Sequence, residues 1–195
     1  EAKQFNTTAF VYVGELCRYL SFQDPSEEEK DNPISSMVGN GLRPDLWDCF
    51  RNRFNVERIV EIYGASEGNA LFMNLLNKDE TIGMTNARVA LFEYDVAEDK
   101  LVKDTESKFI EVGEGQPGLL LVEIGPDAIY NGYTDKKASE EKVISNVFEE
   151  GDRWFNTGDL VKTMDVGFSL GRTHYQFVDR VGDTFRWKSE NVSTN

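Results

Sequence analysis

Apolar positions near the start of the chain recur at three- and four-residue spacing. They are Ala9, Val13, Leu16, Cys17 and Leu20. This spacing puts apolar side chains on one helix face. It predicts a core-packing helix that begins at Thr7 or Thr8, whose hydroxyls can cap it, and ends near Phe22. The acidic segment 23–33 is interpreted as a solvated loop.

Two further apolar runs, at 34–38 and 56–63, predict strands that each end in a glycine-rich turn. Pro44 suits the first turn of a helix between them, which we expect to end near Phe54. Ligands bind beyond the carboxyl ends of strands in open α/β sheets. This order of elements therefore predicts a nucleotide site at one edge of a sheet.

After residue 77 the pattern changes to short alternating runs separated by tight turns. Strands are expected over 87–95, 109–112 and 119–124. We also expect a helix over 135–147, with Thr134 as its cap. The pattern as a whole predicts an α/β part followed by antiparallel β structure, in the form of a small barrel or curled sheet.

Composition narrows the functional classes. Hydrophobic residues make up 39% of the 195 positions, which is enough for a core. The net charge of −14 argues against nonspecific nucleic-acid binding, because phosphate backbones attract Lys and Arg. Cys17 and Cys49 are interpreted as reduced core thiols of a cytosolic protein. No apolar run approaches the ~20 residues of a membrane span. The first residue is not Met, so we expect the chain to begin within a longer protein.

The turn after the second predicted strand carries three kinds of side chain. Tyr63 offers a flat face for a ring, and Ser66 offers a donor for a phosphate oxygen. Glu67 is a hard oxygen ligand of the kind that suits Mg²⁺ beside substrate phosphates. Glycines on both sides of the Ser66-Glu67 pair permit close backbone approach. A plain surface turn after a strand explains an isolated pattern of this kind equally well.

Two later clusters are also candidates. Asp159 follows a Thr-Gly pair, where its carboxylate can accept hydrogen bonds from a ribose diol; an Asx-type turn is the alternative. Arg180, in a segment with charges of both signs around Gly182, can reach a ribose or a phosphate; a charged surface hairpin is the alternative. His174 is the only histidine and is interpreted as a surface or turn residue.

Five segments together resemble the adenylate-forming superfamily, which includes acyl-CoA synthetases, luciferases and peptide-synthetase adenylation domains. The segments are 12–20, 39–47, 63–69, 154–160 and 177–193. They occur in the family's order from one end of the chain to the other. Within the superfamily they are most similar to the very-long-chain acyl-CoA synthetases, also called fatty acid transport proteins.

The resemblance implies a fold class, α/β plus antiparallel β, and a division of the chain. The chain would be a fragment of the large N-terminal domain of an adenylate-forming enzyme, with an α/β sheet layer followed by a small β-barrel-like subdomain. Residues 1–86 would form the α/β part and 87–178 the β-rich subdomain. Residues 179–195 would hold the hinge, at Gly182 and Asp183, and the start of the small C-terminal domain.

The resemblance also implies a two-step ligase whose substrates are a fatty acid, ATP and CoA, with Mg²⁺. The acid reacts with ATP to give an acyl-adenylate and pyrophosphate, and CoA then displaces AMP. Carried over position by position, Gly39, Asn40 and Gly41 would line the adenine, and Tyr63 would stack on it.

The implied catalytic residues are Ser66 and Glu67. Ser66 would touch the α-phosphate and Glu67 would hold the Mg²⁺ ion. Asp159 and Arg180 would bind the ribose hydroxyls. The resemblance thus assigns each part of the nucleotide to named residues of this chain.

Three features depart from the family pattern. Ser66 stands where Thr is usual, and Ser189 stands where the branch usually has Gly, in the segment that approaches CoA. The phosphate loop expected before Glu1 and the catalytic lysine expected after Asn195 are absent from the chain. We therefore expect the chain alone to be inactive and its full-length parent to be active.

Two other functions stay open. The parent could be a ligase for another carboxylic acid, such as a bile acid, or the chain could be a non-catalytic fragment that binds AMP, ATP or a partner. We expect a cytoplasmic protein. Membrane association is implied for some members of the branch, and no residue of this chain indicates it.

Overall fold

The computed structural model describes residues 1–64, 70–125, 140, 142–181, 184–187 and 190–193. Its amino-terminal part is an α/β layer built on one sheet, in the order β1-β2-β3-β4. The strands are β1 (Ala9–Val13), β2 (Ser36–Asn40), β3 (Arg58–Gly64) and β4 (Leu71–Met73). The first three are parallel, and β4 runs antiparallel to β3. The layer therefore has the strand–helix–strand order that the apolar runs predict.

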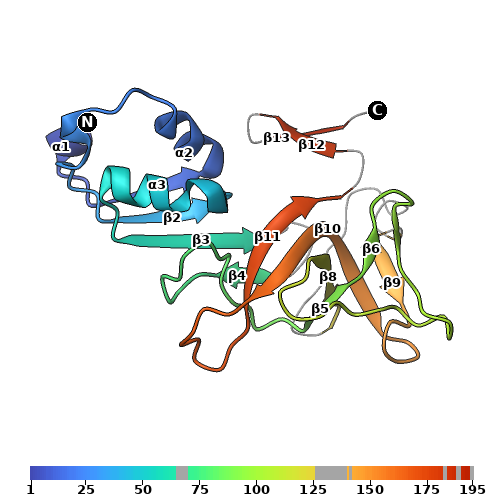
Figure 1. The fold of residues 1–195 in the computed structure, drawn as a ribbon. Coiled ribbons are helices and arrows are strands. Elements are labelled where there is room, and N and C mark those ends of the chain that lie inside the picture. Colours follow the sequence, from blue (N-terminus) through green and yellow to red (C-terminus); the bar gives the residue numbers. More distant parts are fainter. Residues whose placement is uncertain (65–69, 126–139, 141, 182–183, 188–189, 194–195) are drawn as a thin grey trace.

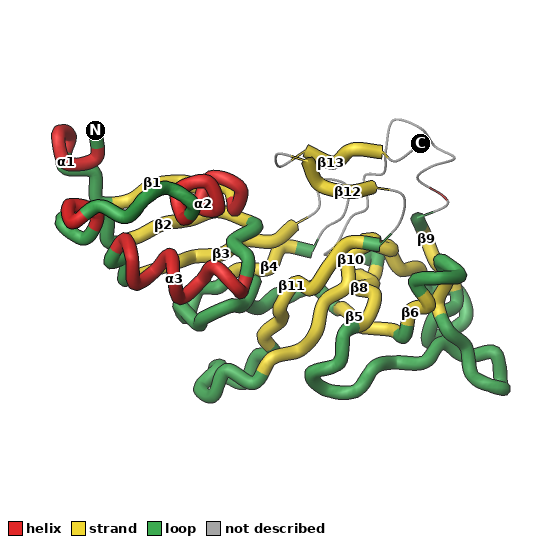
Figure 2. The backbone as a smooth tube through the Cα atoms, turned by 45° about the horizontal axis from the view of Figure 1, so that its top comes forward, coloured by secondary structure: helices red, strands yellow, loops and turns green. Residues whose placement is uncertain are grey.

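Helices α2 (Gly14–Ser21) and α3 (Pro44–Phe54) lie over one face of this sheet (Figures 1 and 2). A short helix α1 (Ala2–Phe5) and a 3₁₀ turn η1 (Glu27–Glu29) complete the layer. The core between helices and sheet consists of Tyr12, Cys17, Met37, Leu42, Trp47, Phe50, Val56 and Ile59. The helix expected from Pro44 to Phe54 is confirmed, and it ends at Asn55 in the left-handed conformation that often closes helices.

The helix expected from Thr7 or Thr8 to Phe22 is wrong in its first half. Residues Ala9–Val13 form β1, and the helix begins only at Gly14. The aromatic and β-branched run of β1 suits a pleated strand, and Tyr12 is buried there. The spacing that suggested one helix was not a burial pattern, because Ala9, Val13 and Leu16 are exposed.

The carboxyl-terminal part is antiparallel. Its main sheet has the order β11-β10-β8-β5, and β9 also pairs with β10. The strands are β5 (Val89–Phe92), β8 (Gly118–Glu123), β9 (Val143–Ser145), β10 (Arg153–Met164) and β11 (His174–Arg180). Two hairpins complete it: β6 (Tyr94–Asp95) with β7 (Lys100–Leu101), and β12 (Thr184–Trp187) with β13 (Glu190–Ser193). The expected fold class of α/β plus antiparallel β structure is confirmed.

Some expectations for this part need correction. The helix over 135–147 is wrong at its end, because Val143–Ser145 forms β9 against β10; Thr134 lies outside the described residues. β-branched side chains there suit a strand. The strand expected over 109–112 contributes two isolated bridges, through Phe109 and Glu111. The boundaries at 86 and 178 stay a prediction.

Two single-residue interpretations are also wrong. Cys17 is buried as expected, but Cys49 is exposed on the outer side of α3, so it is not a core thiol. His174 is fully buried in β11 rather than at the surface. Its Nδ1 atom lies 3.2 Å from the carbonyl oxygen of Arg172. Strand pairing with Met164 brings this imidazole inside, which a single histidine in a polar segment does not reveal.

The two parts meet along β3 and β4. Phe72 of β4 is buried together with Ile82, Leu120 and Val161. The backbone N–H of Ile82 donates to the carbonyl of Tyr175 at 2.9 Å, which ties the connecting segment to β11. Figure 1 shows the carboxyl end of β3 directed at β11. This junction is where residues far apart in the sequence come together.

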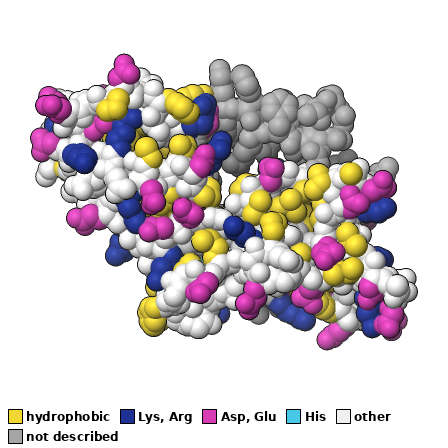
Figure 3. Space-filling view, viewed as in Figure 1, with side chains coloured by type: hydrophobic (Ala, Val, Ile, Leu, Met, Phe, Trp, Pro, Cys, Tyr) yellow, Lys and Arg dark blue, Asp and Glu magenta, His cyan; other side chains and the backbone are white. Residues whose placement is uncertain are grey.

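Surface charge and helix length add two observations. Figure 3 shows acidic and basic side chains interspersed over the viewed face, so the net charge of −14 is not gathered in one region of that face. In the portion of the chain described above, no helix has both the length and the apolar character needed to cross a bilayer.

Candidate functional site

Tyr63 and Asp159 form the centre of the candidate site. The Tyr63 hydroxyl donates to Asp159 Oδ2 at 2.6 Å, although the residues come from different sheets. The Tyr63 ring packs edge-on against Phe72, with centroids 5.4 Å apart, and lies 6.3 Å from the ring of Phe177. Contacts on two sides fix this ring beside a carboxylate that is only 6% exposed.

Arg180 is the second partner of Asp159. The two residues are paired across β10 and β11, and Arg180 Nε lies 3.3 Å from Asp159 Oδ1. The guanidinium is about one-third exposed, so one side of this ion pair faces solvent. Asp159 therefore has partners from both β3 and β11.

A bulge in β10 sets the direction of Asp159. Pairing with β8 shifts between Asn156 and Leu160, and Gly158 has a φ of 73°. The N–H of Gly158 donates to Asn156 Oδ1 at 2.9 Å, and the N–H of Asp159 donates to Thr157 Oγ1 at 3.1 Å. The Asx-type turn considered as an alternative is therefore present, and it presents the carboxylate at the same time. Bulges often re-aim a side chain in this way.

Burial keeps the Tyr63 hydroxyl in its donor form. Desolvation, followed by the nearby negative charge of Asp159, raises the pKa of Tyr63 well above its ordinary value of 10.0. The phenol therefore stays protonated at neutral pH and remains a hydrogen-bond donor to the carboxylate. Its ring face, not its acidity, is the feature that a ligand could use.

The turn after β2 lies at the neighbouring strand end. Gly39 packs closely against β1, since a Cβ atom at this position would lie 2.0 Å from the carbonyl oxygen of Tyr12. Asn40 is exposed, and Gly41 has a φ of 79°, which favours glycine. Since β2 pairs with β3, this turn and Tyr63 lie at the carboxyl ends of adjacent parallel strands.

Glu61 is a site residue that the sequence analysis missed. Its carboxylate is 3% exposed and accepts from the Tyr12 hydroxyl and from the N–H groups of Gly41 and Leu42. Burial raises the pKa of Glu61 to about 7, against the lowering effect of these donors. The available signal was a lone carboxylate within the apolar run 59–62, since a buried charge needs partners.

The structure brings some of the predicted residues together and leaves others untested. Tyr63, Asp159 and Arg180 are in contact, and the Gly39-Asn40-Gly41 turn adjoins them through β3. The remaining predicted residues lie outside the described part of the chain: Ser66, Glu67, Gly182, Asp183 and Ser189.

A fixed aromatic ring and a buried carboxylate are in contact, and a glycine turn lies at the neighbouring strand end. Their role in binding a nucleoside stays a prediction. Among the described residues, no three His, Cys, Asp or Glu side chains gather in a metal-binding group. Because Glu67 is not among them, its suitability for Mg²⁺ stays a prediction.

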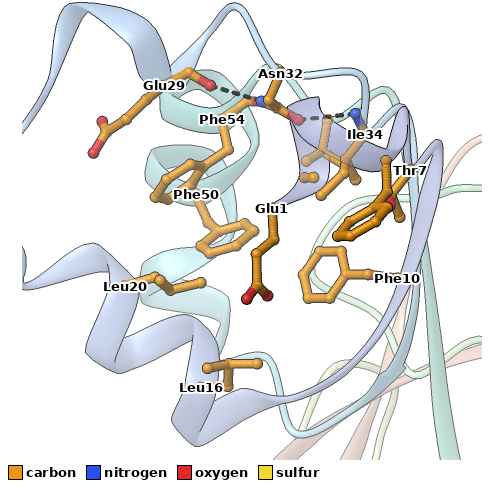
Figure 4. A pocket seen from close by; sticks show the side chains of 13 residues that line it. Glu1, Thr7, Phe10, Leu16, Leu20, Glu29, Asn32, Ile34, Phe50 and Phe54 are labelled. Atoms are coloured by element: carbon orange, nitrogen blue, oxygen red, sulfur yellow. Dashed lines mark hydrogen bonds between the residues drawn. The ribbon is translucent and has the colours of Figure 1, made fainter.

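A separate apolar cavity lies at the opposite end of the α/β layer. It measures about 520 Å³ and is lined by residues from α1, β1, α2 and α3, among them Phe10, Leu16 and Phe50 (Figure 4). Asn32 Nδ2 donates to the carbonyl oxygen of Glu29 at its rim. The cavity is lined by none of the candidate site residues that the sequence analysis named.

Comparisons with known proteins give close relatives of known activity. No family model matches the chain. The medium/long-chain fatty acid–CoA ligase FadD6 of Mycobacterium tuberculosis is 45% identical over 187 residues, which cover 96% of this chain and 30% of the ligase. Long-chain fatty acid transport protein 6 of the mouse, Mus musculus, is 39% identical over 201 residues, covering 100% of this chain and 32% of that protein. The chain thus spans less than a third of these curated relatives.

Solved structures show the same fold at lower identity. ATP-bound MatB from Rhodopseudomonas palustris superposes with a TM-score of 0.61 at 17% identity, over 99% of this chain and 36% of MatB. The long-chain fatty acid–CoA ligase FadD1 from Archaeoglobus fulgidus gives a TM-score of 0.55 at 19% identity, over 93% of this chain and 36% of the ligase. The curated relatives and these folds agree with the resemblance of the sequence motifs. The chain therefore belongs to the adenylate-forming superfamily, in the branch that contains fatty acid–CoA ligases and long-chain fatty acid transport proteins.

Proposed function

We propose that the full-length protein is an ATP-dependent fatty acyl-CoA ligase. The fatty carboxylate attacks the α-phosphorus of ATP, the bond to the bridging oxygen of pyrophosphate breaks, and an acyl-adenylate forms. The CoA thiol then attacks the acyl carbonyl, loses its proton and displaces AMP. The observation that carries this proposal is the contact of Tyr63 with Asp159 and of Asp159 with Arg180, in a chain that is 45% identical to a fatty acid–CoA ligase.

The described residues bind the nucleoside in this proposal. The adenine stacks on the Tyr63 ring and lies along the Gly39-Asn40-Gly41 turn, where exposed backbone allows close approach. Asp159 accepts hydrogen bonds from the ribose hydroxyls while it keeps its bond from Tyr63. Arg180, about one-third exposed beside it, offers further donors to the ribose.

The phosphate end is proposed from the sequence resemblance. Ser66 touches the α-phosphate and Glu67 holds Mg²⁺, which neutralises charge on the phosphate oxygens. Residues 179–195 form the hinge, at Gly182 and Asp183, and the start of the small domain, which brings CoA to the adenylate. We propose the activity for the full-length protein and not for the 195-residue chain alone.

The proposed substrate class and subcellular location are taken from the names of the relatives. A fatty acid is the proposed acid because FadD6 is a medium/long-chain fatty acid–CoA ligase at 45% identity. We propose a cytoplasmic protein that can associate with a membrane, because the transport-protein relatives handle long-chain fatty acids. A ligase for another acid, such as a bile acid, and a non-catalytic nucleotide-binding fragment remain the alternatives.

The test is acid-dependent exchange of labelled pyrophosphate into ATP by the full-length protein. The acids run from medium to very long chain and include a bile acid. The variants are Glu67→Ala and Asp159→Ala, with Glu106→Ala as control, since Glu106 is an exposed hairpin carboxylate paired only with Lys108 in the described residues. We expect exchange that requires a fatty acid and is lost in both site variants but not in the control.

Other results would decide against this function. Exchange with the bile acid but with no fatty acid would favour the other-acid ligase. A folded full-length protein that binds ATP and shows no exchange with any acid would refute the ligase and favour the non-catalytic fragment.

A further inference from the structure

Three residues lie in one line across the α/β sheet. Tyr12 of β1 is paired with Gly39 of β2, and Gly39 is paired with Glu61 of β3. Parallel neighbours present their side chains on the same face, so the Tyr12 ring must cross the place of the Gly39 side chain to reach Glu61. A Cβ atom on Gly39 would lie 2.7 Å from Tyr12 Cδ1. The missing side chain of Gly39 is what lets the two outer residues meet.

The carboxylate of Glu61 holds three elements at once. Its Oε2 accepts from the Tyr12 hydroxyl, and its Oε1 accepts from the N–H groups of Gly41 and Leu42. These two amides belong to the turn that leads from β2 into α3. Glu61 also lies two residues before Tyr63 on the same strand. The same short stretch of β3 backbone therefore positions both the turn and the ring.

The turn is confined from its other side as well. Gly14, the first residue of α2, packs so closely that a Cβ atom there would lie 1.6 Å from the carbonyl oxygen of Gly41. The turn is thus in close contact with α2 on one side and hydrogen-bonded to Glu61 of β3 on the other. Its position depends on Glu61 because the amides of Gly41 and Leu42 have this carboxylate as their acceptor.

We propose that Glu61 is a positioning residue for the nucleotide, which fixes the Gly39-Asn40-Gly41 turn relative to Tyr63 so that an adenine fits between them. This inference rests on the proposed function, because it takes the turn and the ring as the two sides of the base site. Glu61 acts through the turn: all three of its hydrogen-bond donors are protein groups, and it is 3% exposed.

The ionised form of Glu61 is the one that fits its surroundings. Its described partners are all donors, and a protonated carboxyl would turn one acceptor into a donor that faces them. The titratable groups that face it are Tyr12 from β1 and Cys17 from α2. Burial raises the pKa of both, that of Cys17 to about 12, so both stay neutral near pH 7. Of Glu61, Tyr12 and Cys17, only Glu61 changes its charge near pH 7.

The experiment measures the dissociation constant of ATP for the full-length protein from about pH 6 to about pH 8.5, on either side of the shifted carboxyl pKa. The variants are Glu61→Gln, which keeps the shape and removes the charge, and Tyr12→Phe, which removes one donor. Glu57→Gln, an exposed carboxylate just before the same strand, is the control. Each variant is compared with the wild type at the same pH, so that titration of ATP itself cancels.

We expect the wild-type advantage over Glu61→Gln to grow several-fold as pH rises through about 7. Because the Tyr12 hydrogen bond lowers the pKa of Glu61, the midpoint in Tyr12→Phe should move to higher pH. Glu57→Gln should follow the wild type. Hydrogen exchange without nucleotide supplies a second measurement: the Gly41 and Leu42 amides should exchange faster in Glu61→Gln and not in the control.

Two results would overturn this inference alone: equal ATP affinity of wild type and Glu61→Gln at every pH, or unchanged exchange of both amides. A wild-type protein that binds no ATP would overturn the proposed function as well. These failures are distinguishable because the first two occur in a protein that binds ATP.

Discussion

Asp159 Oδ2 accepts a hydrogen bond of 2.6 Å from the hydroxyl of Tyr63, a residue that lies 96 positions earlier in the chain. The contact joins the parallel sheet to the antiparallel one at the carboxyl end of β3. It places an aromatic ring and a carboxylate side by side, which is the arrangement that the proposed nucleoside site uses. Each of the following predictions concerns a substitution in this arrangement or in the residues that hold it in place.

Replacing Asp159 with Asn keeps the shape of the side chain and removes its charge. ATP affinity should fall about tenfold, which corresponds to the ~1.4 kcal/mol expected for a hydrogen bond to a charged group. Equilibrium binding of ATP to the full-length protein measures this. Asp165→Asn, in the exposed loop after β10, is the matched control. Equal affinities of Asp159→Asn and the control would contradict the ribose role.

Tyr63 can be divided into its ring and its hydroxyl. Tyr63→Phe should keep stacking and lower ATP affinity only a few-fold, whereas Tyr63→Ala should lower it by a further factor of about ten or more, since aromatic stacking on a base contributes about 1–3 kcal/mol. Binding of AMP by both variants tests this division. If Tyr63→Phe and Tyr63→Ala bind equally, the ring does not stack on the base.

The Asp159–Arg180 pair should be worth about 1 kcal/mol of coupling, because one partner is buried and the other is one-third exposed. Urea unfolding of Asp159→Asn, Arg180→Ala and the double variant measures it in a cycle. A coupling energy near zero would mean that the 3.3 Å contact contributes no stability and that Arg180 acts only on a ligand.

Glu61 should make folding stability fall as pH rises. The folded-state pKa, about 7, lies above the ordinary value of 4.5, so the folded chain holds this proton more tightly than the unfolded chain. The resulting stabilisation is fully present below about pH 4.5 and is lost as pH rises through about 7. Relative to Glu61→Gln, the wild-type free energy of unfolding should fall by about 3 kcal/mol over this range.

Urea unfolding at several pH values measures the effect in the wild type and in Glu61→Gln. As pH rises, the stability of the wild type relative to Glu61→Gln should fall, whereas its ATP affinity relative to Glu61→Gln should increase. The two measurements therefore separate the free-energy cost of burying the charge from its contribution to ATP binding. A stability difference between the two proteins that does not depend on pH would contradict this prediction.

Gly14→Ala should destabilise the α/β layer by about 1–3 kcal/mol, because its Cβ would lie 1.6 Å from the carbonyl oxygen of Gly41 and the backbone must shift. Gly125→Ala is the control, since a Cβ atom there has no neighbour within 4 Å among the described residues. Thermal unfolding compares the two. Equal melting temperatures would show that the turn can move away from α2 without cost.

Local signals predicted those parts of the fold that depend on local chemistry. Pro44 marked the start of α3, because proline favours the first turn of a helix, and the expected end near Phe54 agrees with the structure. The segment from Ala9 to Leu20 was mispredicted: it holds a strand and a helix joined at Gly14, and the apolar spacing that suggested one helix includes the exposed residues Ala9, Val13 and Leu16. Periodicity cannot place such a junction when both elements face one core.

Long-range pairing explains what the sequence could not show about the site. Local patterns pointed to Tyr63, Asp159 and Arg180 one by one and the resemblance assigned their roles, but only the fold brings them into contact. Glu61 escaped notice because its partners are set by the pairing of Gly39 with both Tyr12 and Glu61. A one-residue shift in either register would put the Tyr12 and Glu61 side chains on opposite faces of the sheet.

The span between Tyr63 and Asp159 has a consequence for synthesis of the protein. A ribosome that adds 5–20 residues per second needs roughly 5–20 s to travel from one to the other. During that interval the emerging α/β layer displays the Tyr63 ring without the strand that will cover its edge. Until β10 and β11 have been made, the Tyr63 ring at the end of β3 lacks its contacts with Asp159 and Phe177.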